Sequence, residues 1–192
     1  MSKEAIEIIK AEHRSLSAVL ESADYLIGEI RAKRIKPDFQ LLGALLNYID
    51  TFPETLHHPK EDRFLFARLR QRTRAADSLL DELEAQHRSG EMRVRELHLA
   101  LARFEVEGDG ALDSFANTLT AFTELSWRHM TVEEKELIPL AERYLLDIDW
   151  EEVAAAFRDN NDPMFGSTRS DHFRQLFRQI VNMTPPPLGL GG

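Results

Sequence analysis

The sequence predicts an all-α protein, an up-down-up-down four-helix bundle with a C-terminal helical extension. Apolar residues recur every three or four positions in four long segments, which is the pattern of amphipathic helices. The connections expected near residues 35–37, 72–76 and 108–111 are short, and short connections join antiparallel neighbours in a bundle. We therefore expect one helical domain over residues 1–147 and an extension over residues 148–192.

The first two helices are predicted from apolar patterns over residues 6–30 and 42–64. A basic run follows the first pattern, and cations are favourable at the C-terminal end of a helix. Pro37 is expected in the first turn of the second helix, where its missing N–H is harmless. Pro53 and Pro59 lie inside the second pattern, so we expect the helix to bend or restart beside them.

The third and fourth helices are predicted over residues 80–104 and 112–140, with the turn signal Gly108–Gly110 between them. Beyond them, Trp150–Arg158 has the pattern of a short helix, and residues 168–183 have helical spacing again. The Pro/Gly-rich end should be extended or disordered. We expect this extension to cover the bundle or to form a homo-oligomer contact.

The composition excludes several classes of protein. The net charge of −9 over 192 residues argues against non-specific binding to nucleic acid or to an anionic membrane. The chain has no cysteine, which excludes disulfides, thiolate zinc sites and cysteine-ligated iron–sulfur clusters. The N-terminus lacks the apolar core of a signal peptide, and no apolar run approaches the ~20 residues of a membrane span. We therefore expect a cytoplasmic protein without nucleic-acid or membrane partners.

One histidine lies in the apolar pattern of each predicted helix, and two of the four are followed one turn later by a carboxylate. The set is His13, His57, Glu61, His87, His129 and Glu133. Residues four apart project from the same helix face, so each His–Glu pair points in one direction. Burying such groups is expensive unless a metal ion compensates them. Six ligands exceed a tetrahedral zinc site, and imidazole with carboxylate and no thiolate indicates iron or manganese, as a pair of ions.

Several neighbouring residues compete with this assignment. His58 and Asp62 form a second one-turn pair, which lies about 100° around the helix from the first pair. We favour the first pair, because both cannot face one metal centre equally well. Glu134 can reach a metal if the helix bends, and Glu91 is a ligand, a supporting group or an exposed residue. His98 is ~16 Å along the helix from the third-helix histidine and is interpreted as structural.

Two other interpretations remain open. Ferritin-like di-iron bundles use Glu-x-x-His on two helices, and the chain contains Glu54-x-x-His57 and Glu84-x-x-His87. In this chain the carboxylates Glu61 and Glu133 follow the histidines by one turn, which fits histidine-rich ligation better than the ferritin-like pattern. The simplest alternative is a bundle in which the histidines are hydrogen-bonded core residues and no metal is present.

Over residues 1–147 the chain resembles the hemerythrin family, in particular the bacterial HHE cation-binding domain. The family pattern is one His, then His-x-x-x-Glu, then one His, then a second His-x-x-x-Glu on successive helices. The matching residues are His13, His57/Glu61, His87 and His129/Glu133, and the segment LHHPKED is typical of the HHE group. The resemblance implies an oxo- or hydroxo-bridged non-heme di-iron centre, with Glu61 and Glu133 bridging the irons and the histidines at terminal positions.

The chain departs from the oxygen carriers of this family at Glu91, where those proteins have another histidine. One fewer imidazole favours the ferric state and chemistry with peroxide or nitric oxide over simple oxygen carriage. The resemblance implies a protein that binds or senses O₂ or NO, or reacts with peroxide. The alternative is an iron-handling protein or a di-iron stress-response enzyme, of the peroxide-decomposing or iron–sulfur repair type, so enzymatic activity is left open.

Overall fold

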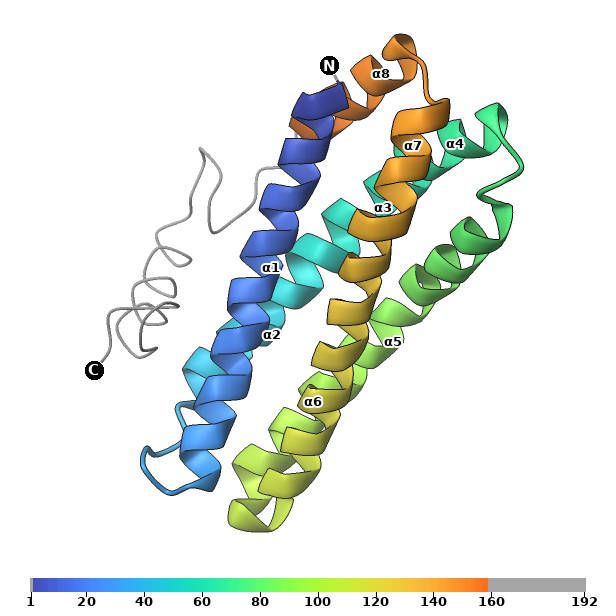
Figure 1. The fold of residues 1–192 in the computed structure, drawn as a ribbon. Coiled ribbons are helices and arrows are strands. Elements are labelled where there is room, and N and C mark those ends of the chain that lie inside the picture. The colour runs from blue at the N-terminus through green and yellow to red at the C-terminus, as the bar shows by residue number, and fades with distance from the viewer. Residues whose placement is uncertain (1, 159–192) are drawn as a thin grey trace.

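The computed structural model describes residues 2–158, and these form the predicted antiparallel helical bundle (Figure 1). The first helix is α1 (Ser2–Arg31), and the third is α5 (Asp77–Glu107). The second consists of α2 (Phe39–Ile49), η1 (Asp50–His57), α3 (His58–Lys60), η2 (Glu61–Phe66) and α4 (Ala67–Arg72). The fourth consists of α6 (Asp109–Val132), η3 (Glu133–Leu137) and α7 (Ile138–Tyr144), and α8 (Asp147–Arg158) follows it. The helix predicted over 168–183 and the Pro/Gly-rich end lie outside the described residues.

Two helix ends are set by single residues. Asp38 caps α2, because its Oδ1 accepts a hydrogen bond from the Leu41 N–H at 2.9 Å. Pro37 therefore precedes the cap, and the expectation that it lies in the first turn of the second helix is wrong. At the other end of the bundle, Gly108 joins α5 to α6 with a φ of 64°, a conformation that favours glycine.

Three π-helical segments, η1, η2 and η3, interrupt the second and fourth helices. A π turn holds more residues than an α turn and is frequent at functional sites. The His58 N–H bonds to the carbonyl of Pro53, and the Ile138 N–H bonds to the carbonyl of Glu133. Proline cannot donate a backbone hydrogen bond, and Pro53 and Pro139 lie within or beside these segments. The interruption predicted at the prolines of the second helix thus takes the form of π turns.

The apolar core consists of two clusters with a polar layer between them. The first cluster packs residues such as Leu20, Leu45 and Phe115, and the second packs residues such as Ile9 and Leu83. Along each bundle helix the two clusters occupy different ends, and buried polar residues such as His13, His57 and Glu133 lie near the boundary between them. The two clusters therefore hold the polar layer from both sides.

α8 lies across the end of the bundle beside the start of α1 (Figure 1). Trp150, Val153 and Phe157 of α8 are buried in the second apolar cluster. Asp149 accepts hydrogen bonds from the Leu146 N–H and from Arg72, and these bonds fix the first turn of α8. Of the helices that the structure describes, none combines the length and the apolar character needed to cross a membrane.

Candidate metal centre

The structure brings the six residues predicted as ligands together in the polar layer. They come from all four bundle helices: His13, His57, Glu61, His87, His129 and Glu133. Their side chains are between 1% and 9% exposed. Groups of this kind are seldom buried so deeply without partners. The layer therefore requires compensation of its charges from within.

The imidazoles of the layer form two sets. We call His13 and His57 the first histidine set, and His58, His87 and His129 the second histidine set. One ligand atom from each member of the first set and one from Glu61 lie within 4.8 Å of one another. The same holds for the second set with Glu61. Each group thus offers enough nitrogen and oxygen atoms to hold a cation.

Two carboxylates connect the sets, because each directs one oxygen toward each set. Glu61 Oε1 lies 3.3 Å from Nε2 of His57, and Glu61 Oε2 lies 3.6 Å from Nε2 of His87. Glu133 Oε2 lies 3.3 Å from Nε2 of His13, and its Oε1 lies 3.3 Å from Nε2 of His129. Each of the two carboxylates can therefore contribute an oxygen to the ligand atoms of either set.

The Nδ1 atoms of the five imidazoles all have side-chain partners on the outer side of the layer. The pairs are His13–Glu134 (3.0 Å), His57–Glu12 (2.6 Å), His58–Glu54 (3.3 Å), His87–Asp62 (2.8 Å) and His129–Gln86 (2.9 Å). An Nδ1–H that donates to such a partner fixes the orientation of the ring and leaves Nε2 as the ligating atom. This arrangement is typical of histidines that bind metals.

Several polar atoms at the centre of the layer are buried without hydrogen-bond partners among residues 2–158. They are Nε2 of His13 and of His57 and all four carboxylate oxygens of Glu61 and Glu133. A buried polar atom without a partner costs about 1–3 kcal/mol. Since these atoms converge from different helices, one or two cations would satisfy them together. The donor set therefore fits a metal with a preference for nitrogen and oxygen.

The local electrostatics show how protons substitute for a cation. Burial opposes the charging of His13, but the adjacent Glu133 carboxylate and the hydrogen bond to Glu134 outweigh it and raise its pKa to about 9. Burial likewise opposes ionisation of Glu133, but the adjacent imidazoles of His129 and His13 hold the pKa of that carboxyl well below its usual range. Burial and the neighbouring imidazoles lower the pKa of His58 well below its ordinary value. His58 is thus neutral, which is the form that binds metals.

His58 was missed as a ligand candidate by the sequence analysis. The spacing predicts that His57 and His58 cannot face one centre equally well, but the structure places them in different sets, and both lie in the polar layer. Asp62 was paired with His58 by its one-turn spacing, and it contacts His87 instead. The sequence did hold a signal for His58. Each of the two consecutive histidines has a glutamate one turn away: Glu61 follows His57, and Glu54 precedes His58.

The other competing residues lie outside the centre. Glu134 accepts a hydrogen bond from Nδ1 of His13 on the outer side of the layer, whereas Glu133 faces Nε2 of the same ring at the centre. Glu91 is on the surface, with its side chain 84% exposed, and His98 lies in a surface depression beside it. Glu84 forms an ion pair with Arg70, so the ferritin-like arrangement is not formed.

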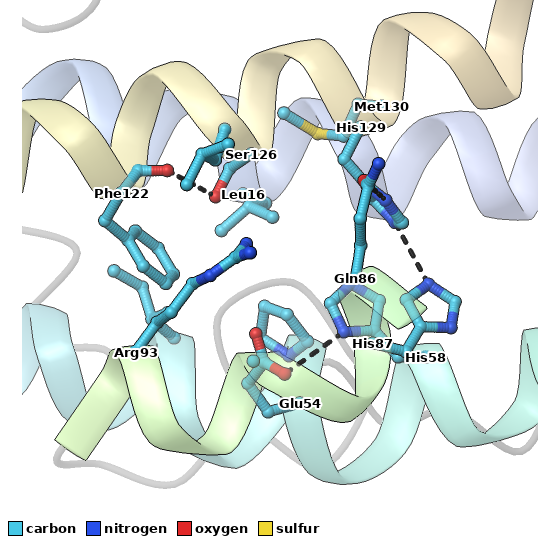
Figure 2. A pocket seen from close by; sticks show the side chains of 14 residues that line it. Leu16, Glu54, His58, Gln86, His87, Arg93, Phe122, Ser126, His129 and Met130 are labelled. Carbon is cyan, nitrogen blue, oxygen red and sulfur yellow. Dashed lines mark hydrogen bonds and ion pairs between the residues drawn. The ribbon is translucent and has the colours of Figure 1, made fainter. Parts of the chain in front are cut away.

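A small cavity reaches the second histidine set from the side (Figure 2). Its volume of about 40 Å³ has room for a few atoms, whereas a cavity that takes benzene measures about 150 Å³. Glu54 and Arg93 face this cavity, together with Gln86 and Ser126. Burial raises the pKa of Glu54 to about 7. The cavity is therefore small and partly polar.

Comparison with known proteins agrees with this geometry. The family described as hemerythrin HHE cation-binding domain matches residues 4–141. No curated protein matches the chain. No solved structure matches it either. Because the match spans most of the chain and includes every residue of both histidine sets and both central carboxylates, the chain belongs to the hemerythrin HHE cation-binding domain family.

Proposed function

We propose that the protein holds a di-iron centre of the hemerythrin type and binds or senses O₂ or NO there. The observation that carries this proposal is the pair of carboxylates, Glu61 and Glu133, each with one oxygen toward each histidine set. A site for one ion has no need of two such carboxylates. Iron fits a donor set of imidazole and carboxylate without thiolate.

The proposed ligands divide unequally between the two ions. His13 and His57 would hold the first ion, and the three imidazoles of the second histidine set would hold the other. If Glu61 and Glu133 each contributed to both ions, the chain would supply four ligands to the first and five to the second. Both numbers are below the six of an octahedral ion, so positions remain for a small ligand. Bound iron would supply a redox-active centre for that ligand.

His58 changes one expectation from the sequence. The glutamate at position 91 suggested one imidazole fewer than in an oxygen carrier. The second helix supplies the further imidazole, since His58 lies with His87 and His129 in one group. The number of imidazoles therefore no longer argues against O₂ binding, and both diatomic ligands are included in the proposal.

Reaction with peroxide is a second candidate function, and the cavity beside the second histidine set favours it. Polar groups of Glu54, Gln86, Arg93 and Ser126 line this cavity, and its volume is about 40 Å³. A polar molecule of a few atoms fits such a space, whereas an organic substrate of ordinary size does not. Peroxide has the required size and can both donate and accept hydrogen bonds.

The first test is the metal content of protein produced in iron-supplemented medium, with absorption spectra before and after reduction. The proposal predicts about two irons per chain, as the two groups of ligands require. His57→Ala and Glu61→Ala should each lose most of the metal, because each removes a buried ligand. His98→Ala is the matched control, since this histidine lies in the surface depression. Equal metal content in all four proteins would contradict the assignment.

The second test separates the two candidate functions. Binding or sensing predicts that the reduced protein changes its spectrum on addition of O₂ or NO without continued consumption of the gas. A peroxide-decomposing enzyme predicts steady consumption of added hydrogen peroxide at a rate proportional to the iron-loaded protein. A protein that holds iron and responds to none of the three molecules would overturn both candidates and leave only the metal site.

A further inference from the structure

α8 contributes an aromatic ring to the edge of the metal centre, although it follows the residues that match the family. Phe157 is 1% exposed, and its ring centroid lies 5.7 Å from that of His57, with the two rings nearly perpendicular at 82°. Glu12 accepts a hydrogen bond from Nδ1 of the same imidazole at 2.6 Å. His57 is thus held by a carboxylate from α1 and by a phenyl ring from α8.

Basic residues of the second helix fasten α8 in this position. Lys60 donates to the carbonyl of Ala156 at 2.9 Å, and further ion pairs join the same two segments. The ion pairs are Arg68–Glu152 and Arg72–Asp149. These basic residues belong to α3 and α4, which flank η2 and its ligand Glu61. α8 is therefore attached to the segment that supplies three of the proposed ligands.

The far end of α8 is attached to α1. Arg158 forms a bidentate ion pair with Glu4, with distances of 2.6 and 2.9 Å. The pair is at the surface and contributes little by itself. Phe157 directly precedes Arg158, so this contact and the bond from Lys60 lie on either side of the aromatic ring. The ring is held over His57 from two directions.

We infer that Phe157 is a positioning residue of the metal centre: it fixes the His57 ring, excludes water from its bond to Glu12 and thereby slows the loss of metal. The inference rests on the proposed metal site. Partners that orient a ligand typically change metal affinity by roughly 10–100-fold when they are removed. A cavity in place of the phenyl ring would give the imidazole freedom to turn and would admit water to its Nδ1–H.

The test measures how fast iron leaves the loaded full-length protein for an excess of a coloured iron chelator. Phe157→Ala should release iron roughly 10–100 times faster than the parent protein. Phe157→Leu should restore most of the slow release, because leucine refills much of the space. Val153→Ala is the matched control: Val153 is also buried in α8 within the second apolar cluster, and it carries no aromatic ring. It should change the rate by less than about threefold, as expected for a variant that only weakens packing.

A second measurement is made on the metal-free protein and does not depend on iron. The Nδ1–H of His57 should give an NMR signal that exchanges slowly with water, because Glu12 and Phe157 protect it. Phe157→Ala should accelerate this exchange, whereas Val153→Ala should leave it nearly unchanged.

The outcomes distinguish this inference from the proposed function. If the parent protein binds no iron, the proposed metal site fails, and the exchange of the His57 proton still tests the positioning role. If iron is bound and Phe157→Ala releases it at the parent rate, the positioning role is refuted while the site stands. If Val153→Ala has the same effect as Phe157→Ala, the docking of α8 as a whole controls release, and the specific role of Phe157 is refuted.

Discussion

The metal-free protein should lose stability as the pH rises above neutrality, and His13 supplies one of the reasons. In the folded protein its pKa is raised from 6.5 to about 9, because the adjacent Glu133 carboxylate and the hydrogen bond to Glu134 outweigh the effect of burial. A group with a raised pKa stabilises the fold fully below its unfolded pKa, and this contribution is lost as the pH rises through the folded pKa. The shift corresponds to about 3 kcal/mol, at about 1.4 kcal/mol per unit.

The assay is thermal unfolding of the metal-free protein, followed by circular dichroism at about pH 6 and about pH 9.5 at equal ionic strength. For a chain of this length, about 1 kcal/mol shifts the midpoint by roughly 2–4 °C, so His13 alone should contribute a decrease of roughly 6–12 °C. In His13→Gln the decrease in the midpoint should be smaller, because the contribution of His13 is gone. Part of the decrease should remain, because the pKa values of His57 and His87 are raised as well. Glu134→Gln should also make the decrease in the midpoint smaller, because this variant removes the charge of one of the carboxylates that raise the pKa of His13.

Two results would refute the reasoning. An unchanged midpoint between the two pH values would show that the imidazoles of the layer are not charged in the folded protein. An equal decrease in His13→Gln would show that another group is responsible. Iron-loaded protein provides the opposite expectation, because metal ions and protons compete for the same nitrogens. Its advantage in stability over the metal-free protein should grow as the pH rises.

Two further predictions concern single side chains. Gly90→Ala should weaken iron binding by roughly tenfold, because an added Cβ would overlap the Glu54 carboxylate that orients His58. An iron titration measures this affinity, and an unchanged affinity would contradict the prediction. Leu45→Ala should lower the free energy of unfolding by about 2–5 kcal/mol, since Leu45 is fully buried in the first apolar cluster. Leu99→Ala, at a surface position 60% exposed, should change the free energy of unfolding by less than about 0.5 kcal/mol. Both free energies are measured by urea titration.

The bundle was predictable because its evidence is repeated many times along the chain. The apolar period of α1, α5 and α6 extends over many turns, so no single residue decides the assignment. Gly108 marked the turn between α5 and α6 for a local reason, its positive φ. Pro37 was misplaced because two neighbouring residues, Pro37 and Asp38, are both suited to a helix start, and the carboxylate is the one that caps α2.

The site was less predictable, because its geometry depends on departures from the regular α-helix. A regular α-helix of 3.6 residues per turn would place His57 and His58 on different faces. The prolines indicate that the second helix is interrupted, but they do not indicate that the interruption is π-helical. The division into two histidine sets also depends on how the helices pack. Most outer partners are equally hidden from the sequence: Glu12 holds His57 and Glu134 holds His13 across helices.

The layered core explains how one bundle can be stable and still hold a costly polar centre. Five imidazoles and two central carboxylates lie in the layer, and their burial opposes folding unless each charge is matched. The apolar clusters on either side supply the stabilisation, and α8 enlarges the cluster nearest to His57 through Trp150 and Phe157. The layer can then hold residues suited to the proposed metal centre. A variant that shrinks a cluster away from the imidazoles, such as Leu45→Ala, should therefore lower stability without removing metal, whereas replacement of Glu61 should remove metal without breaking the bundle.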